Sequence, residues 1–212
     1  MLKSLSEYPE WAPFFTQPDV VAILKTIDAT VSSRSFYPES NNIFRVFSLP
    51  LQQIRVVILG QDPYPDGNAT GLCFSLSPDA KKLNPSLRNI YKELGKPPQR
   101  DLTHWLSQGC FLLNTALTVE PGQAGSHLKL WRPFTELLLD YISENTKGIA
   151  WILMGAFAAD FQRYTTRNRH RAFITSHPSP LSASRPFQNN PAFLGSGVFT
   201  NVNEFLEKKI EW

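Results

Sequence analysis

The chain has 212 residues, of which 42% are hydrophobic and 18% are charged, and its formal net charge at pH 7 is +3. This length suffices for a single domain with its own core, which we expect to span residues 1–212, and the composition excludes a disordered chain. The small positive charge permits a polyanionic partner without requiring one.

The two cysteines, Cys73 and Cys110, lie far apart in the sequence and stand in no Cys-His cluster. This excludes a four-thiolate iron–sulfur cluster, a zinc finger and a disulfide scaffold, and we expect neither a metal nor another cofactor. The first residues lack the apolar core of a signal peptide, and the apolar stretch 149–159 is far shorter than the ~20 residues that span a bilayer. We therefore expect no secretion and no membrane partner, with a cytoplasmic location for a bacterial or viral source and a nuclear one otherwise.

Apolar runs and helical periodicities alternate along the chain. The runs do not alternate polar with apolar residues, which is typical of strands buried on both faces of a parallel sheet. Between them, apolar residues recur at helical spacing. This order predicts an α/β fold, a three-layer α/β/α sandwich around a four-stranded, mostly parallel sheet. In chain order we expect a helix at 20–27, a strand at 56–59, a helix at 85–94, a strand at 110–113, a helix at 134–142, a strand at 149–154, a helix at 158–164 and a strand at 172–175.

Polar residues follow three of the expected strands, namely Asp62, Asn114 and His177. Ligands of open α/β sheets bind beyond the carboxyl ends of the strands, so these side chains should converge on one cleft. Each alone is compatible with a structural role, as a capped turn, a loop anchor or a satisfied histidine. Together at three strand ends, and beside the stiffening prolines Pro63 and Pro178, they favour a site.

Two segments carry a family resemblance: residues 56–64, VVILGQDPY, and residues 177–182, HPSPLS. They closely resemble the two signature segments of the family 1 uracil-DNA glycosylases. Residues 108–115, QGCFLLNT, residues 117–119, LTV, and residues 122–124, GQA, also resemble that family. The similarity continues through Ser126-His127 to the C-terminal tail, so it runs in order over nearly the whole chain.

The resemblance implies a monofunctional DNA glycosylase that hydrolyses the bond between uracil N1 and deoxyribose C1′. Such an enzyme releases free uracil and leaves an abasic site, which is the first step of base-excision repair. It must flip the nucleotide into a pocket, and cleavage passes through an oxocarbenium-like sugar. By resemblance, Asp62 orients the attacking water, and His177, expected to be neutral, donates a hydrogen bond to uracil O2 as negative charge develops there. No metal is implied.

The family also implies how the base is recognised. The side-chain amide of Asn114 would accept from uracil N3–H and donate to O4, whereas cytosine shows the opposite pattern. Phe74, otherwise an ordinary core aromatic, would stack on the base. Tyr64 would exclude the methyl group of thymine, and Gln61 would contribute through its loop backbone.

The partner implied by the resemblance is uracil-containing DNA, single- or double-stranded, bound by a monomer. Leu181 would be the wedge that fills the gap left by the flipped nucleotide. A proteinaceous glycosylase inhibitor or a replication or repair protein is a further possible partner. The residues expected to contact phosphates are Pro85, Ser86, Gly155, Ser179 and Arg185.

The sequence departs from the family pattern in a few places. Pro65 stands where cellular members usually carry His, and the stretch 64–71 is one residue shorter than usual. Gly155-Ala156-Phe157 replaces the common Gly-Ser-His, and the segment 184–191 is longer. We expect these departures to affect the grip on DNA and the rate more than the reaction.

The sequence fits other functions less well than the glycosylase. A DNA-binding or polymerase-associated scaffold of the same fold, with weak catalysis, stays open because the phosphate-contact segments are altered. An unrelated α/β hydrolase or nucleotide-binding protein lacks its motifs here, and the absent Cys-x-x-Cys excludes a zinc nucleobase deaminase.

Overall fold

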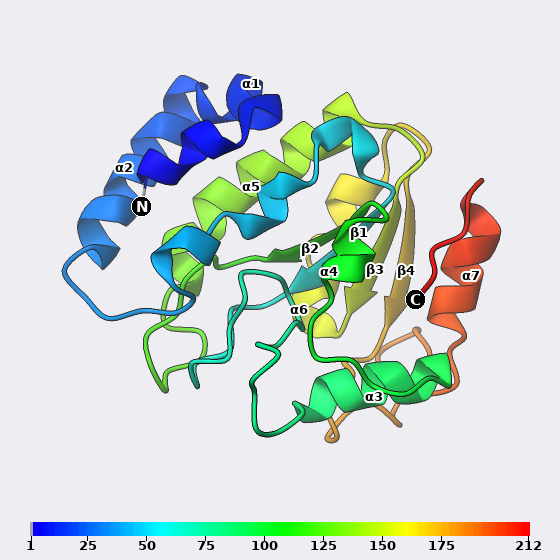
Figure 1. Cartoon of the computed structure of the whole chain (residues 1–212). Helices are drawn as coiled ribbons and strands as arrows, with labels where there is room; N and C mark the ends of the chain where they lie inside the picture. The colour runs from blue at the N-terminus through cyan, green and yellow to red at the C-terminus, as the bar shows by residue number, and fades with distance from the viewer. Residues whose placement is uncertain (1) are drawn as a thin grey trace.

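A parallel sheet of four strands forms the centre of the computed structural model, which describes residues 2–212 (Figure 1). The strand order is β2-β1-β3-β4, and every neighbouring pair is parallel, which confirms the predicted α/β fold and makes the sheet wholly rather than mostly parallel. The strands are β1 (Val56–Gly60), β2 (Cys110–Asn114), β3 (Ala150–Met154) and β4 (Arg171–Thr175).

Burial explains why these segments are strands. All residues of β1, β2 and β3 are buried, as their continuous apolar sequences require, whereas the edge strand β4 is partly exposed.

Helix α2 packs against α5 on one side of the sheet, and α7 lies beside β4 (Figure 1). The α-helices are α1 (Ala12–Phe15), α2 (Pro18–Val31), α3 (Pro85–Leu94), α4 (Thr103–Leu106), α5 (Leu128–Asn145), α6 (Ala156–Ala159) and α7 (Val198–Phe205). Short 3₁₀ helices occur at Leu2–Glu7, Pro9–Trp11, Ser40–Asn42, Arg45–Ser48, Leu51–Gln53 and Gln162–Thr165.

Three of the four predicted helices are present, at α2, α3 and α5. The prediction of one helix over residues 158–164 is wrong, because α6 ends at Ala159 and a separate 3₁₀ turn covers Gln162–Thr165. The backbone N–H of Phe161 bonds the carbonyl of Ala158, and that of Tyr164 bonds Phe161, each three residues back. These tighter turns still bury Phe161 and Tyr164, so the apolar spacing is met without an α-helix.

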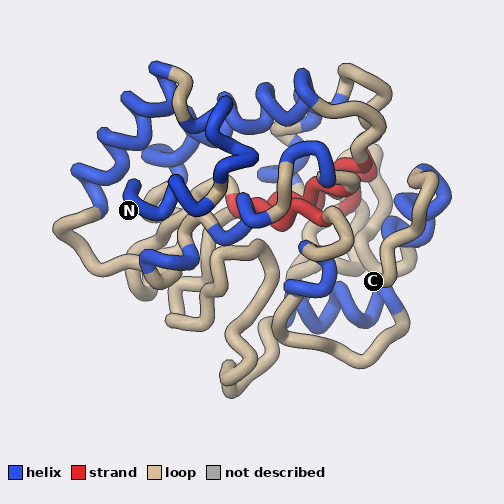
Figure 2. Tube along the Cα trace, turned by 45° about the horizontal axis from the view of Figure 1, so that its top comes forward, coloured by secondary structure: helices blue, strands red, loops and turns tan. Residues whose placement is uncertain are grey.

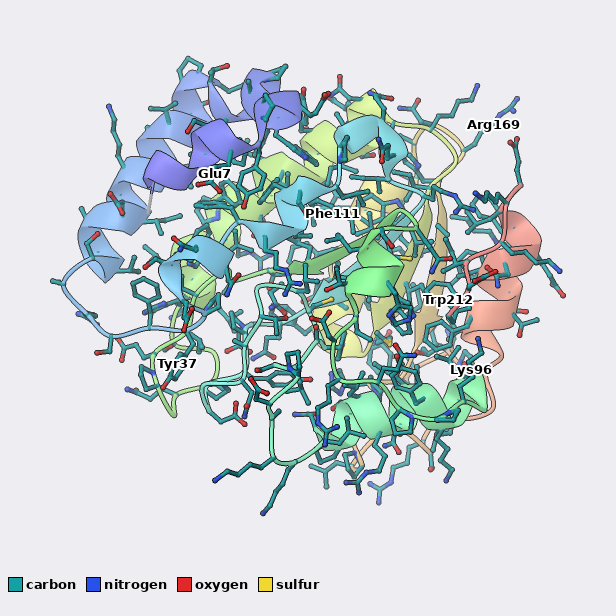
Figure 3. The ribbon with its side chains drawn as sticks, viewed as in Figure 1. Glu7, Tyr37, Lys96, Phe111, Arg169 and Trp212 are labelled. Carbon is teal, nitrogen blue, oxygen red and sulfur yellow. The ribbon has the colours of Figure 1, made fainter. Side chains whose placement is uncertain are left out.

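Aromatic side chains fix the N-terminal segment onto the sheet. The ring centroid of Trp11 lies 5.0 Å from that of Phe47 and 5.5 Å from that of Phe111 in β2. The indole N–H of Trp11 also donates to the Leu49 carbonyl at 2.9 Å, so this buried polar group is satisfied. Phe111 lies in the middle of the molecule, surrounded by side chains (Figure 3). The strand ends that carry the site therefore rest on a tightly packed core.

Long loops follow β1, β2 and β4, covering residues 61–84, 115–127 and 176–197, and they appear as extended tan stretches of the tube (Figure 2). Because the strands are parallel, all three loops leave the same edge of the sheet. Within residues 2–212, none of the helices combines the length and the apolar character needed to cross a membrane.

Candidate active site

A cavity of about 230 Å³ lies at the carboxyl edge of the sheet. Asp62, Asn114 and His177, which follow three different strands, all line it, so the structure brings the three together as the topology predicts. The predicted residues Gln61, Tyr64, Phe74 and Ser86 line the same cavity.

Asp62 is half-buried, and its carboxylate is held on one side. The backbone N–H of Gly125 donates to Oδ2 at 2.5 Å, while Oδ1 has only a long contact of 3.4 Å with the Gln61 amide nitrogen. Burial raises the pKa of Asp62, and the bonds from Gly125 and Gln61 oppose that rise in pKa. Oδ1 is thus available to accept a hydrogen bond from a water molecule.

The backbone of Gln61 joins the loop after β1 to the loop after β2. Its carbonyl accepts from the hydroxyl of Thr115 at 2.8 Å and from the backbone N–H of Ala116 at 3.0 Å. The segment that carries Asp62 is therefore fixed next to the end of β2, where Asn114 lies.

Asn114 is 4% exposed as a residue, and its side-chain amide opens into the cavity, where it forms no hydrogen bond to any residue in the described range 2–212. An amide that faces a cavity with both its oxygen and its nitrogen free can bind a ligand that offers one donor and one acceptor. Its position depends on Gly60, its neighbour in the β1–β2 register. A β-carbon on Gly60 would overlap Asn114 Oδ1 and would lie 2.6 Å from Cys73 Cβ.

His177 is a neutral hydrogen-bond donor by its contacts. Its Nδ1 accepts from the backbone N–H of Ser179 at 3.0 Å, so in the neutral ring the proton is on Nε2. Burial lowers the pKa of His177, which keeps the ring neutral at pH 7. Gly155 lies against this residue: its φ is +87°, and a β-carbon there would be 2.8 Å from His177 Cβ.

Phe74 and Tyr64 form the aromatic part of the cavity. Phe74 has a φ of +60°, a backbone conformation that non-glycine residues adopt at a cost and that gathers at functional sites. Its ring centroid lies 6.1 Å from that of His177. The Tyr64 hydroxyl donates to the Phe74 carbonyl at 3.4 Å, and burial raises the pKa of Tyr64, so the hydroxyl stays protonated.

Helix α3 contributes to the cavity through its first turn. Asn84 and Ser86 line the cavity, and the Asn84 side chain caps the helix by accepting from the Ser86 N–H at 2.8 Å. Asn89 donates from its amide to the Pro178 carbonyl at 2.8 Å, which ties α3 to the segment carrying His177. Neither asparagine was predicted; Asn84 could have been, because an Asn before Pro-Ser is a helix-start signal, whereas Asn89 has no local signal.

The other predicted DNA-contact residues are not among those that line the cavity. Leu181 is 84% exposed, and it is the one large hydrophobic residue so exposed in the described part of the chain. Its loop is braced by Ser182, whose hydroxyl lies 2.8 Å from that of Ser179 and donates to the His177 carbonyl at 3.1 Å. Pro85 and Arg185 are exposed and do not line the cavity.

A larger cavity of about 710 Å³ lies between α2 and α5, away from these residues. Its arginines are already paired, Arg163 with Glu136 at 2.9 Å and Arg167 with Asp140 at 3.2 Å. Among residues 2–212 no three His, Cys, Asp or Glu side chains are grouped as a metal ion would need. The reactive groups gather in the smaller cavity.

Comparisons with known proteins agree on one family. The family model described as "Uracil DNA glycosylase superfamily" matches residues 47–196. The chain belongs to this superfamily. It is 38% identical to the uracil-DNA glycosylase of Psychromonas ingrahamii, over 95% of this chain and 97% of that protein, and 41% identical to that of Pseudoalteromonas translucida, over 94% and 95%. The family resemblance and the assignment as a glycosylase, a hydrolase, are thereby confirmed.

Solved structures of glycosylases share the fold over most of the chain. The crystal structure of mimivirus uracil-DNA glycosylase aligns with a TM-score of 0.88 and 29% identity, covering 96% of this chain and 86% of that one. A variant of the mimivirus enzyme in complex with UGI aligns with a TM-score of 0.90, covering 96% and 88%.

Proposed function

We propose that the cavity binds a uracil base flipped out of DNA and that the protein hydrolyses its N-glycosidic bond, leaving an abasic site. The observation that carries this proposal is the Asn114 amide, which faces the cavity with no hydrogen bond to the residues in the range 2–212. Uracil presents an N3–H donor beside the O4 acceptor. The amide oxygen can accept from N3–H, and the amide nitrogen can donate to O4. With the amide in this orientation cytosine would be mispaired, and such mispairing is strongly rejected. A cavity of about 230 Å³ suits a single small ring, because pockets for larger ligands measure roughly 300–1,000 Å³.

The proposed reaction uses the two groups flanking the bound base. As the bond from C1′ to N1 breaks, positive charge develops on the sugar and negative charge on uracil. The Asp62 carboxylate, held through Oδ2, orients the attacking water through Oδ1 and stabilises the sugar cation. The Nε2–H of neutral His177 donates to uracil O2, where the negative charge appears. The electron pair of the broken C1′–N1 bond stays on uracil. Water then bonds to C1′ and gives its extra proton to the Asp62 carboxylate, which passes it to solvent, and the uracil anion takes up a proton from solvent on release.

The surrounding residues hold the base and the DNA in this proposal. Phe74 stacks on the ring, Tyr64 fills the space beside C5 where thymine has its methyl group, and Gln61 acts through its loop backbone. Leu181 enters the duplex as the wedge, since an exposed leucine on a braced loop has little else to contact. Phosphates would be bound by Pro85, Ser86, Gly155, Ser179 and Arg185.

We also propose that the 212 residues act as one monomeric domain inside the cell, on single- and double-stranded DNA. The mimivirus relative forms a complex with UGI, and the shared fold supports an inhibitor of this kind as a partner of the present chain.

The test is release of free uracil from a single-stranded oligonucleotide with one deoxyuridine, in the presence of a chelator. Thymine and cytosine oligonucleotides test specificity. We expect release of uracil alone, and losses of about 10²–10³-fold or more in Asp62→Asn, His177→Ala and Asn114→Ala. Asp79→Asn, an exposed aspartate outside the cavity, is the matched control and should keep full activity. A wild type that binds DNA but releases nothing would reject catalysis and favour the scaffold function.

A further inference from the structure

The carboxylate of Asp62 is held by a loop that belongs to another strand. Residues 120–127 follow β2, and we refer to them as the 120–127 loop. Within this loop, Gly125 donates its backbone N–H to Asp62 Oδ2 at 2.5 Å, and Ala124 lines the cavity. The orientation of Asp62 therefore depends on what fixes the 120–127 loop.

Glu120 ties this loop together from its first position. Its backbone N–H donates to the hydroxyl of Ser126 at 2.9 Å, and its carboxylate Oε2 accepts from the Gln123 amide at 2.9 Å. The Gly122 N–H also donates to the Pro65 carbonyl at 2.9 Å, which joins the loop to the segment after Asp62. Gly125 thus lies between Ser126, held by the Glu120 backbone, and Gln123, held by the Glu120 carboxylate, and only the second contact depends on the side chain.

Glu120 is itself fixed from outside the loop. Its Oε1 accepts from Arg34 Nη1 at 2.7 Å, a residue 86 positions earlier. The chain beyond Arg34 is anchored nearby, because Tyr37 and Val119 exchange backbone hydrogen bonds, both of 2.9 Å. Tyr37 lies at the periphery of the molecule, far from the C-terminal Trp212 (Figure 3).

The buried His127 completes the support of Glu120. Its Nδ1 lies 2.9 Å from the hydroxyl oxygen of Thr118, which also accepts from the indole N–H of Trp131 at 2.7 Å. Thr118 is fully buried and has no other hydrogen-bond acceptor among residues 2–212, so its proton goes to His127 Nδ1. The other ring nitrogen, Nε2, faces Glu120 Oε1 at 3.7 Å.

We propose that Glu120 is a positioning residue for Asp62, holding the 120–127 loop so that the Gly125 N–H keeps the carboxylate in place for the attacking water. Glu120 does not line the cavity, so it acts through the loop and not on the substrate. The inference rests on the role proposed for Asp62.

The Gly125 bond also affects the protonation of Asp62. Burial favours the neutral carboxyl, whereas a donated N–H favours the carboxylate, so losing the bond raises the pKa of Asp62 further. The groups that face Asp62 are Gln61 and Gly125, and the other ionisable groups lining the cavity are Tyr64 and His177. The groups that face Glu120 are Arg34 and His127.

The experiment measures kcat and KM for uracil release across pH in Glu120→Ala and Glu120→Gln. We expect kcat to fall about 10- to 100-fold in Glu120→Ala with KM within about twofold, because a misplacement near 1 Å can cost about 10²-fold. The acidic limb of the kcat/KM profile should move to higher pH, which simple destabilisation would not cause. Glu120→Gln, which still accepts from Arg34, should recover part of the loss. Glu136→Gln removes the ion pairs of Glu136 with Arg132 and Arg163, away from the site, and should change neither kcat nor the pH profile.

A second readout protects the test against misfolding. In folded Glu120→Ala, the amide proton of Gly125 should move upfield in the NMR spectrum as its bond to the carboxylate weakens, and it should move less in Glu120→Gln. An unchanged pH limb and rate, or an unmoved Gly125 amide, in folded Glu120→Ala would overturn the inference. Asp62→Asn is measured alongside: if it stays active, the role of Asp62 itself is wrong, whatever the Glu120 variants do.

Discussion

Gly60 has no room for a side chain, because an added β-carbon would overlap atoms of the site. It does not share the positive φ of the other glycines, so the backbone would accept alanine and only the space around it matters. A methyl group would lie 2.6 Å from Cys73 Cβ, about 0.8 Å closer than the ordinary contact that begins at 3.4 Å, and would overlap Asn114 Oδ1. Cys73 cannot easily retreat, because its N–H bonds the Leu112 carbonyl at 3.0 Å and its thiol bonds Ile58 at 3.4 Å.

The Asn114 amide must therefore move in Gly60→Ala, by a distance on the order of 1 Å. We expect overpacking to lower the free energy of unfolding by about 1–3 kcal/mol and the displaced amide to lower uracil release about 10²-fold. Urea unfolding and initial rates on a single-stranded deoxyuridine oligonucleotide measure the two effects.

Gly95→Ala is the matched control. Gly95 ends α3 with a φ of +64° and has no atom within 4 Å of the added carbon, so alanine there costs about 1–2 kcal/mol of backbone strain. It should lose stability and keep activity. If Gly60→Ala also lost stability and kept full activity, then either the position of Asn114 does not depend on Gly60 or Asn114 does not recognise the base.

Three further predictions concern the residues around the base. Leu181→Ala should change the free energy of unfolding by less than about 0.5 kcal/mol, because the side chain is exposed. It should lower kcat/KM more on duplex than on single-stranded DNA. Equal losses of kcat/KM on matched duplex and single-stranded substrates would rule out a wedge. The pKa of His177, followed by NMR, should lie below the ordinary value of 6.5. The neutral His177 ring therefore contributes to stability above pH 6.5, and this contribution is lost at lower pH, where the unfolded chain takes up the proton before the folded chain does. A midpoint above 6.5 would contradict the neutral donor. Burial raises the pKa of Asp62, so the carboxylate destabilises the folded state at pH 7, and Asp62→Asn should unfold at equal or higher urea concentration while losing activity. A lower midpoint would show that the bond from Gly125 outweighs burial.

The sheet could be predicted because its signal is local. Residues 56–59 and 110–113 are apolar without interruption, and only strands covered on both faces need such sequences. The meeting of Asp62, Asn114 and His177 followed from the same inference, since parallel strands end at one edge. The helix expected at 158–164 failed because apolar spacing does not distinguish an α-helix from successive 3₁₀ turns.

The supports of the site could not be predicted, because they join distant parts of the chain. Arg34 reaches Glu120 across 86 positions, and Asn89 reaches Pro178 across 89. No periodicity or motif relates such pairs. Their geometry depends on where the loops lie after folding, and that is set by the packing of the whole molecule.

The hydrogen bonds that orient the reacting groups come from backbone atoms. Asp62 is held by the N–H of Gly125 and His177 by the N–H of Ser179. Pro65 stands at one of the departures from the family pattern. Its backbone carbonyl accepts a hydrogen bond from the Gly122 N–H, and any residue at this position would supply that carbonyl. Ala156 is likewise an exposed first residue of α6 and bonds none of the three side chains. The departures from the family pattern thus remove side chains around the site while the backbone bonds that orient it stay in place, so we expect them to alter DNA affinity and not the reaction.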